Sequence, residues 1–445
     1  MVRSTAKNQK PPVAPLKRPR RFYLILREWR EPIAIFLGLR LGLGLLAFFA
    51  GILFPAIARN GTAPYTLPPL NRWGERLLGV WSHWDGEWYL RIAQNGYQSN
   101  DSTSAFFPIF PIVVKAVGFL LGENYLLAGV LVSSIATLVV FILLYELVKR
   151  DFNRNIASRT TLYLAVFPTA FFLLAIYSEA LFLALVLAAF LVARHYRNWW
   201  LAALLVALAT LTRSWGIALV VPFAWEWWQQ QPNLVLHFRR QLPTTRSRQA
   251  TRGVTVRVEA RPALKSGMTL LIAPILALAA WFLFNGLALG DPFNFIKIQS
   301  EYPWNRHTAW PWEAIWKGAT LFFASRGPDG FLPSAPREDP NLIDFPFFLF
   351  FALLFLIACW QTWRKQLPTA YLLYFGLGLL FPLLSPTPKQ PLLSFPRFGL
   401  ILFPAFILLA QWGVRWCWLH YLYLYVALLL LSLFFGRFAN WYWVA

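Results

Sequence analysis

The sequence predicts an all-α protein that crosses a membrane many times, and three observations support this fold class. Of the 445 residues, 58% are hydrophobic and 18% are aromatic. Only 13% are charged, against about 25% in ordinary soluble domains. Apolar runs recur from Pro32 to the C-terminal region, and about 20 apolar residues suffice to cross a bilayer as a helix. We therefore expect one polytopic helical domain.

Residues 1–31 form a basic, proline-containing tail ahead of the first apolar run. The tail has no apolar core of the kind that a cleavable signal peptide needs, so we expect a disordered cytoplasmic arm. Residues 32–445 are expected to form the single membrane domain, with about eleven transmembrane helices. The candidate spans are 33–57, 125–148, 160–177, 179–196, 199–213, 215–228, 267–288, 345–363, 367–383, 398–414 and 418–435.

The segment 105–122 decides the topology, because it is short, contains two prolines and carries Lys115. If it crosses the membrane, the most basic loop falls outside. If it lies flat as an interfacial helix, the basic connections at 149–159, 194–197 and 239–265 all fall on the side of the N-terminal tail. The positive-inside rule favours the flat arrangement. The resulting loops are 58–124 and 289–344 on the outer face and 229–266 on the cytoplasmic face.

The formal net charge of +22 could indicate a nucleic-acid partner, but the positions of the charges argue against one. The basic excess lies at 3–30 and 239–265, beside apolar segments, where it sets orientation and attracts anionic lipid. Cys359 and Cys417 lie inside apolar segments, which suggests neither a disulfide framework nor a zinc site. We expect membrane lipids as partners, no nucleic acid and no protein-bound metal or other cofactor, with divalent-metal dependence left open.

An acidic residue, Asp85, interrupts the aromatic stretch WSHWDGEWYL. Read as one helix over 81–96, the stretch places Asp85 within an apolar stripe and turns Glu87 away from it. A carboxylate in such a stripe is costly unless it is paired or used. The stripe consists of Trp81, Asp85, Trp88, Tyr89 and Ile92.

Two interpretations of Asp85 follow from this position. The carboxylate pairs with a nearby arginine such as Arg72 or Arg76, or it is a general base that faces a cavity at the membrane surface. Residue chemistry alone does not choose the reaction.

Four segments resemble the PIG-V family of membrane mannosyltransferases: HWDGEWYLRIAQNGY, AFFPIFPI, FPTAFFLLAIYSEALFLAL and ATLTRSWGIAL, in that order. The resemblance covers roughly residues 33–225. In eukaryotes this family adds the second mannose to the GPI glycolipid. The family is similar to the GT-C class of glycosyltransferases. The resemblance therefore implies a GT-C-like fold, a polyprenyl-phosphate sugar donor and interfacial helices in the first outer loop.

The resemblance also implies roles for individual residues. GT-C enzymes carry their catalytic acid in the first outer loop, where Asp85 lies, so Asp85 is expected to be the general base. A lipid phosphate leaving group needs fixed positive charge, which arginine supplies. Arg213 interrupts an apolar span and Arg397 precedes one, so both are candidates for donor binding. The alternative for Arg213 is that it snorkels to the outer interface.

Further candidates for substrate binding lie beside these positions. Glu179 begins a predicted span, where it could equally complement the helix dipole. Glu87 matches an acid of the family motif and could orient the loop. His83 has no further ligands close by in sequence, which favours a structural role over a metal site. The remaining candidates are Trp84, Trp88 and Tyr89.

The chain departs from the family pattern at Trp88–Tyr89, where His followed by an aromatic residue is expected, and at Ser214–Trp215, where Ser-Asn is expected. These departures put the identity of the acceptor in doubt and leave the chemistry intact. Four tryptophans in the outer loop 289–344 could stack on a sugar or an acyl headgroup, although an aromatic belt at the membrane interface is the favoured interpretation. They are Trp304, Trp310, Trp312 and Trp316.

The resemblance thus implies an inverting glycosyltransferase that moves mannose, or another hexose, from a polyprenyl-phosphate donor to a lipid-linked acceptor. The active site is expected on the non-cytoplasmic face of a bacterial plasma membrane or the endoplasmic reticulum membrane. A polytopic transporter is an alternative, although such proteins usually show paired repeats, which are not visible here. A non-catalytic lipid-binding protein is the other alternative.

Overall fold

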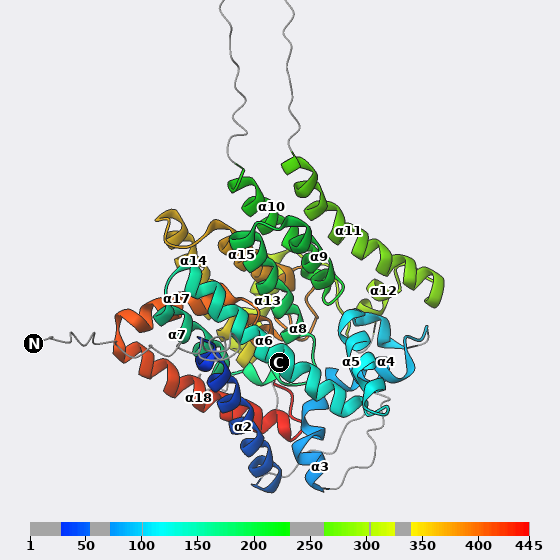
Figure 1. Cartoon of the computed structure of the whole chain (residues 1–445). Helices are drawn as coiled ribbons and strands as arrows, with labels where there is room; N and C mark the ends of the chain where they lie inside the picture. The colour runs from blue at the N-terminus through cyan, green and yellow to red at the C-terminus, as the bar shows by residue number, and fades with distance from the viewer. Residues whose placement is uncertain are drawn as a thin grey trace, which may run out of the picture.

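The computed structural model describes residues 28–53, 72–99, 101–231, 262–301, 304–324 and 340–444. Within these ranges every regular element is a helix (Figure 1), which confirms the predicted all-α class. The predicted tail 1–31 lies largely outside the described residues. Parts of the three predicted loops 58–124, 229–266 and 289–344 lie outside them as well.

The helices follow one another through the whole described chain. The α-helices are α2 (Arg30–Leu53), α3 (Arg72–Leu77), α4 (Asp85–Asn95), α5 (Ile109–Leu120), α6 (Tyr125–Asp151), α7 (Arg154–Ala165), α8 (Glu179–Leu191), α9 (Trp199–Thr210), α10 (Val220–Gln229), α11 (Pro262–Leu289), α12 (Asn294–Ser300), α13 (Pro311–Ala324), α14 (Asn341–Trp363), α15 (Thr369–Leu383), α16 (Phe395–Gly399), α17 (Phe403–Arg415) and α18 (Cys417–Ala439). Short 3-10 helices are η1 (Gly79–Ser82), η2 (Ser102–Ala105), η3 (Ala170–Leu173) and η5 (Ser214–Leu219), and η4 (Val192–Tyr196) is a π-helical turn.

Asparagine side chains fix where several of these helices begin. Asn124, Asn153 and Asn198 stand just before α6, α7 and α9. Each side-chain oxygen accepts a hydrogen bond from the backbone N–H three residues later, at 3.0–3.1 Å. This pairing satisfies one of the N–H groups that a helix start leaves without a partner.

Six of the described helices are long and apolar enough to cross a membrane, so the protein is a multi-pass membrane protein. They are Arg30–Leu53, Tyr125–Asp151, Glu179–Tyr196, Gly267–Leu289, Asn341–Trp363 and Cys417–Ala439. The apolar helices α5, α9 and α15 are shorter. The count of eleven spans stays a prediction.

Three sequence-predicted helices are interrupted in the structure. The segment 160–177 is not one helix, because α7 ends at Ala165, shortly before Pro168. Proline lacks a backbone N–H and disfavours helical geometry in the residue before it. The segment 398–414 is divided between α16 and α17, with Pro404 at the start of α17. The segment 81–96 is divided as well, since η1 ends at Ser82 and α4 begins only at Asp85.

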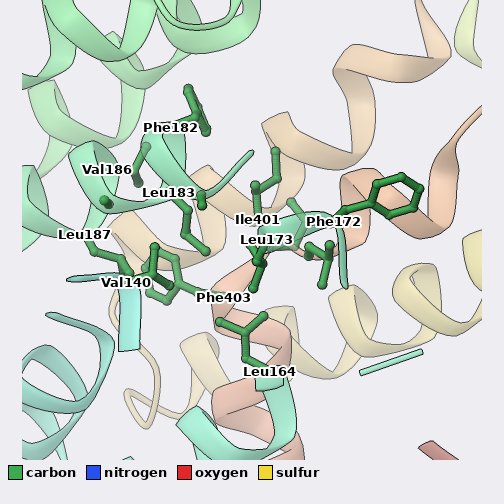
Figure 2. Packing of buried hydrophobic residues seen from close by; sticks show 14 of the residues in the cluster. Val140, Leu164, Phe172, Leu173, Phe182, Leu183, Val186, Leu187, Ile401 and Phe403 are labelled. Carbon is green, nitrogen blue, oxygen red and sulfur yellow. The ribbon is translucent and has the colours of Figure 1, made fainter. Parts of the chain in front are cut away.

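The irregular stretch between α7 and α8 lies at the centre of the core. Phe171 to Tyr177 are at most 2% exposed, and Figure 2 shows Phe172 and Leu173 among the buried hydrophobic side chains of the core. Non-helical backbone at membrane depth is tolerated only where the protein satisfies its polar groups. Here Thr137 Oγ1 donates to the Leu173 carbonyl at 2.5 Å. Ile176 N–H donates to the Trp81 carbonyl at 2.8 Å, which ties this stretch to the one before α4.

The basic connections gather at one end of the helices. Lys149 pairs with Glu28 at 2.5 Å, Arg154 pairs with Glu31, and Arg194 binds Asp151 at 3.2 Å. Glu179 begins the same helical run that carries Arg194. At 1.5 Å per residue the two lie roughly 22 Å apart. The helix end at Glu179 is therefore the one opposite to the basic end.

The predicted interfacial segment 105–122 begins at the last residue of η2 and contains α5, so it is not one long helix. α5 has 12 residues, or about 18 Å, which is short of a hydrocarbon core of about 30 Å. It packs beside α4 and α6 (Figure 1) and exposes Ile112, Phe119 and Leu120. Its length is compatible with lying along the membrane surface, and its depth in the membrane stays a prediction.

Candidate active site

A cavity of about 370 Å³ opens where several helices begin or break. Its charged lining comes from the first residues of α4 and α8, the turn before η5, the segment after α12, and α16. Where a helix begins or breaks, backbone N–H and C=O groups lack partners within the helix. Polar groups therefore collect at such places. The charged residues that line the cavity are Asp85, Glu179, Arg213, Arg306 and Arg397.

Asp85 is set into the cavity wall by an unusual turn. Trp84, directly before it, has φ 59°, a left-handed conformation that costs about 1–3 kcal/mol in a bulky residue. Tyr177 holds the turn from both sides. Its hydroxyl accepts from the Asp85 N–H at 3.2 Å and donates to the His83 carbonyl at 3.1 Å. The turn places the Asp85 side chain, 15% exposed, at the first position of α4.

Asp85 pairs with Arg397, from a part of the chain far away in sequence. Arg397 Nη1 lies 2.6 Å from Asp85 Oδ2, across a separation of 312 residues. The predicted partnership with Arg76 is wrong, because Arg76 donates to the Gly51 carbonyl at 2.9 Å. The ion pair also combines the two interpretations of Asp85, since the carboxylate is paired and faces the cavity at once.

Glu179 joins the two predicted arginines. Its Oε1 lies 2.6 Å from Arg213 Nη1 and 3.3 Å from Arg397 Nε. The Glu179 side chain is only 1% exposed, whereas that of Arg213 is 15% exposed. Glu179 is therefore the buried partner that holds both guanidinium groups in place. Arg213 takes part in this buried pair, which argues against simple snorkelling.

Ser178 connects Tyr89 to the same network. Its hydroxyl accepts from the Tyr89 hydroxyl at 2.9 Å and from Arg213 Nη1 at 3.3 Å. Tyr89 lines the cavity, and burial raises the pKa of its phenol, with the Glu179 charge adding to the rise. The phenol is therefore a neutral hydrogen-bonding group.

Arg397 stays charged in spite of its burial. Burial alone would lower the pKa of its guanidinium, but the carboxylates of Asp85 and Glu179 outweigh burial and raise that pKa above its ordinary value. Arg397 is a fixed positive charge in direct contact with Asp85.

The other predicted site residues next to Asp85 lie outside the cavity lining. Trp84 packs edge-on against Trp443, with ring centroids 5.1 Å apart. Trp88 is buried and stacks on Phe106 at 6.0 Å. Glu87 is buried, with 2% exposure, and the structure does not bring it to the cavity. These residues pack around the turn and α4 on the side away from the cavity.

His83 has structural contacts with the C-terminal segment. Its ring stacks on Trp441 at 3.8 Å, and its Nδ1 lies 3.0 Å from the Phe438 carbonyl. Within the described ranges, no group of three or more His, Cys, Asp or Glu residues could hold a metal ion.

Sequence reasoning missed the contribution of the segment after α11. Gln299, Trp304 and Arg306 all line the cavity. Trp304 is half-buried there, whereas Trp310, Trp312 and Trp316 are 64–72% exposed as an interfacial belt requires. One signal could have found Arg306: it is a basic residue in a predicted outer loop, where the positive-inside rule expects few.

Comparisons with known proteins bear on this site. Residues 46–242 match the Mannosyltransferase (PIG-V) family model. GPI mannosyltransferase 2 of Drosophila melanogaster is 52% identical over 44 residues, 10% of each chain. GPI alpha-1,6-mannosyltransferase 2 of Homo sapiens is 32% identical over 193 residues, 40% of this chain and 39% of that protein. The chain thus spans less than two fifths of these curated relatives.

Among solved structures, the Archaeoglobus fulgidus oligosaccharyltransferase in complex with Zn and sulfate is similar with a TM-score of 0.41 and 12% identity. The similarity covers 92% of this chain and 53% of that chain. Asp85, Glu179 and Arg213 fall inside the family match, whereas Arg306 and Arg397 fall outside it. The match confirms the resemblance carried by the four motifs: residues 46–242 of this chain are similar to the PIG-V mannosyltransferases.

Proposed function

We propose that this protein is an inverting membrane glycosyltransferase that moves mannose from a polyprenyl-phosphate donor to a lipid-linked acceptor. The observation that carries the proposal is the Asp85 carboxylate in one cavity with the guanidinium groups of Arg213 and Arg397. The PIG-V match of residues 46–242 supports mannose as the sugar.

In this mechanism Asp85 acts on the acceptor. As the acceptor hydroxyl oxygen forms a bond to the sugar C1, Asp85 accepts the hydroxyl proton. The bond between C1 and the phosphate oxygen breaks, and the polyprenyl phosphate leaves with the electron pair. A general base must lie within hydrogen-bond reach of the hydroxyl, and Asp85 is open to the cavity.

The arginines act on the leaving group. Negative charge grows on the phosphate oxygen as the bond breaks, and preorganised guanidinium groups stabilise such charge in a site with little water. Arg213 and Arg397 are preorganised because Glu179 holds both. The remaining lining is rich in apolar side chains, including Phe106, Phe295 and Phe381, which suits a substrate attached to a lipid.

The proposal is tested by following the sugar. Purified protein supplied with radiolabelled polyprenyl-phosphate mannose and a glycolipid extract should transfer label to one glycolipid. The same glycolipid should be one hexose shorter in cells that lack the gene, as measured by mass spectrometry. Protein that has been heat-inactivated is the control. If the purified protein transfers no label and the cellular glycolipids are unchanged, the non-catalytic lipid-binding alternative holds.

A second prediction concerns the membrane side of the site. With Cys359 and Cys417 replaced, single cysteines at Gln94 and Arg197, both exposed, are treated with a membrane-impermeant thiol reagent. Gln94→Cys lies on the helix of Asp85, and Arg197→Cys lies at the basic end. In right-side-out vesicles we expect only Gln94→Cys to react, because the basic end belongs inside. Labelling of Arg197→Cys before permeabilisation contradicts the non-cytoplasmic site.

A further inference from the structure

Arg306 is held at the cavity by the backbone pairing of the residues that follow it. His307 N–H donates to the Pro386 carbonyl at 3.1 Å, and Ala309 N–H donates to the Leu384 carbonyl at 3.2 Å. Arg306 Nη1 itself donates to the Ser385 carbonyl at 3.1 Å. The segment that carries Arg306 is therefore fixed against the end of α15, and its guanidinium group is fixed with it.

The charges around the cavity do not balance without a ligand. Arg213 and Arg397 are bonded to the carboxylates of Glu179 and Asp85. Arg306 has no carboxylate partner among the residues that the structure describes, and its buried Nε has no hydrogen-bond partner there either. Three guanidinium groups thus face two carboxylates, which leaves one positive charge in excess.

The surroundings of Arg306 disfavour its positive charge. Burial lowers the pKa of the Arg306 guanidinium to about 10, and the charges of Arg397 and Arg213 add to this while Asp85 opposes it. A guanidinium group has five N–H donors in a planar fork that matches a phosphate. An anion in the cavity would therefore accept hydrogen bonds from the unpaired Arg306 donors. It would also offset the repulsion between Arg306 and the charges of Arg213 and Arg397.

We propose that Arg306 is a further residue that binds the phosphate group of a lipid phosphate, beside Arg213 and Arg397. The assignment rests on the proposed function, which supplies a lipid phosphate as donor and product. Two further features of the cavity lining support it. Trp304 Nε1 is a buried donor with no described partner, and Trp304 lines the cavity. Ile296 of α12, which also lines the cavity, is 51% exposed and offers apolar surface for a lipid chain.

The test measures binding without sugar transfer. The full-length protein in detergent is titrated with farnesyl phosphate, a short polyprenyl phosphate, and with farnesol and inorganic phosphate. Arg306→Gln should weaken farnesyl phosphate binding by about tenfold or more, the cost of losing a charged hydrogen bond. Arg306→Lys should bind between Arg306→Gln and the unaltered protein. Lys317→Gln removes one exposed positive charge from α13 and should bind normally.

The results separate this inference from the proposed function. If Arg306→Gln binds farnesyl phosphate as tightly as the unaltered protein, the inference is wrong even when sugar transfer is observed. If Arg306→Gln weakens farnesol as much as farnesyl phosphate, the residue supports the fold and not the phosphate. If inorganic phosphate binds as tightly as farnesyl phosphate, a free phosphate and not a lipid phosphate is the ligand. If farnesyl phosphate binding depends on Arg306 but no sugar is transferred, the proposed transferase function is wrong and this inference stands.

Discussion

Replacing Asp85 with Asn is expected to lower turnover by about 10²–10⁴-fold, the usual range for loss of a general base. Asparagine keeps the size of the side chain and can still accept from Arg397, but it cannot take the acceptor proton. Turnover is measured as transfer of radiolabelled mannose from the polyprenyl-phosphate donor under saturating conditions. A loss confined to turnover, with donor binding retained, identifies Asp85 as the base.

A second carboxylate in the same predicted outer loop serves as the control. Asp101 pairs with Arg91 at 2.6 Å and is 12% exposed, so Asp101→Asn also breaks a half-buried ion pair. Asp101 does not line the cavity. We expect Asp101→Asn to transfer sugar at close to the normal rate. Near-normal sugar transfer by Asp85→Asn would show that Asp85 is not the general base.

Replacing Glu179 with Gln is expected to lower the free energy of unfolding by about 3–5 kcal/mol, the cost of removing one partner of a buried ion pair. Glutamine has nearly the same size, but it leaves Arg213 and Arg397 side by side without their shared negative charge. The effect is measured by thermal or denaturant unfolding in detergent. Glu313→Gln, which breaks an exposed pair with Lys317, should cost about 0–1 kcal/mol.

The double variant Glu179→Gln, Arg213→Gln distinguishes charge from packing. If uncompensated positive charge causes the loss, removal of Arg213 should restore part of the stability, so the two changes should be strongly non-additive. Simple addition of two separate losses would show that Glu179 matters for packing and not for charge. Sugar transfer should remain low in the double variant, because the leaving group loses a guanidinium group.

The helical class and much of the site could be predicted because both depend on local composition. Runs of apolar residues determine the helices, and a charged residue within or beside such a run must be paired or face a cavity. Asp85, Arg213 and Arg397 were found by this reasoning, and the structure brings all three into one cavity. Glu179 was found as the first residue of a span, although its role as a shared partner was not visible.

The remaining features depend on contacts that a one-dimensional pattern does not contain. Helical periodicity continues through His83 and Trp84, whereas the chain breaks there because Tyr177 and the Trp81 carbonyl hold a left-handed turn. Hydrophobicity alone likewise continues past Ala165, but Pro168 and the satisfied backbone beyond it end the helix. Arg306 lies in a loop without an apolar period, and only the pairing of that loop with the end of α15 brings it to the site.

His83 contacts the last turn of α18 and the residues after it, and this contact bears on how the site assembles. The turn ahead of Asp85 packs on Trp441 and bonds to Phe438, a contact that joins positions 355 residues apart. Chains emerge and insert in order from the N-terminus, so Asp85 enters the membrane long before the residues that brace its turn. Fragments that stop short of α18 therefore carry every family motif but lack this brace on the turn ahead of Asp85. We therefore expect the turn ahead of Asp85 to be fully braced only once α18 and the residues after it have folded.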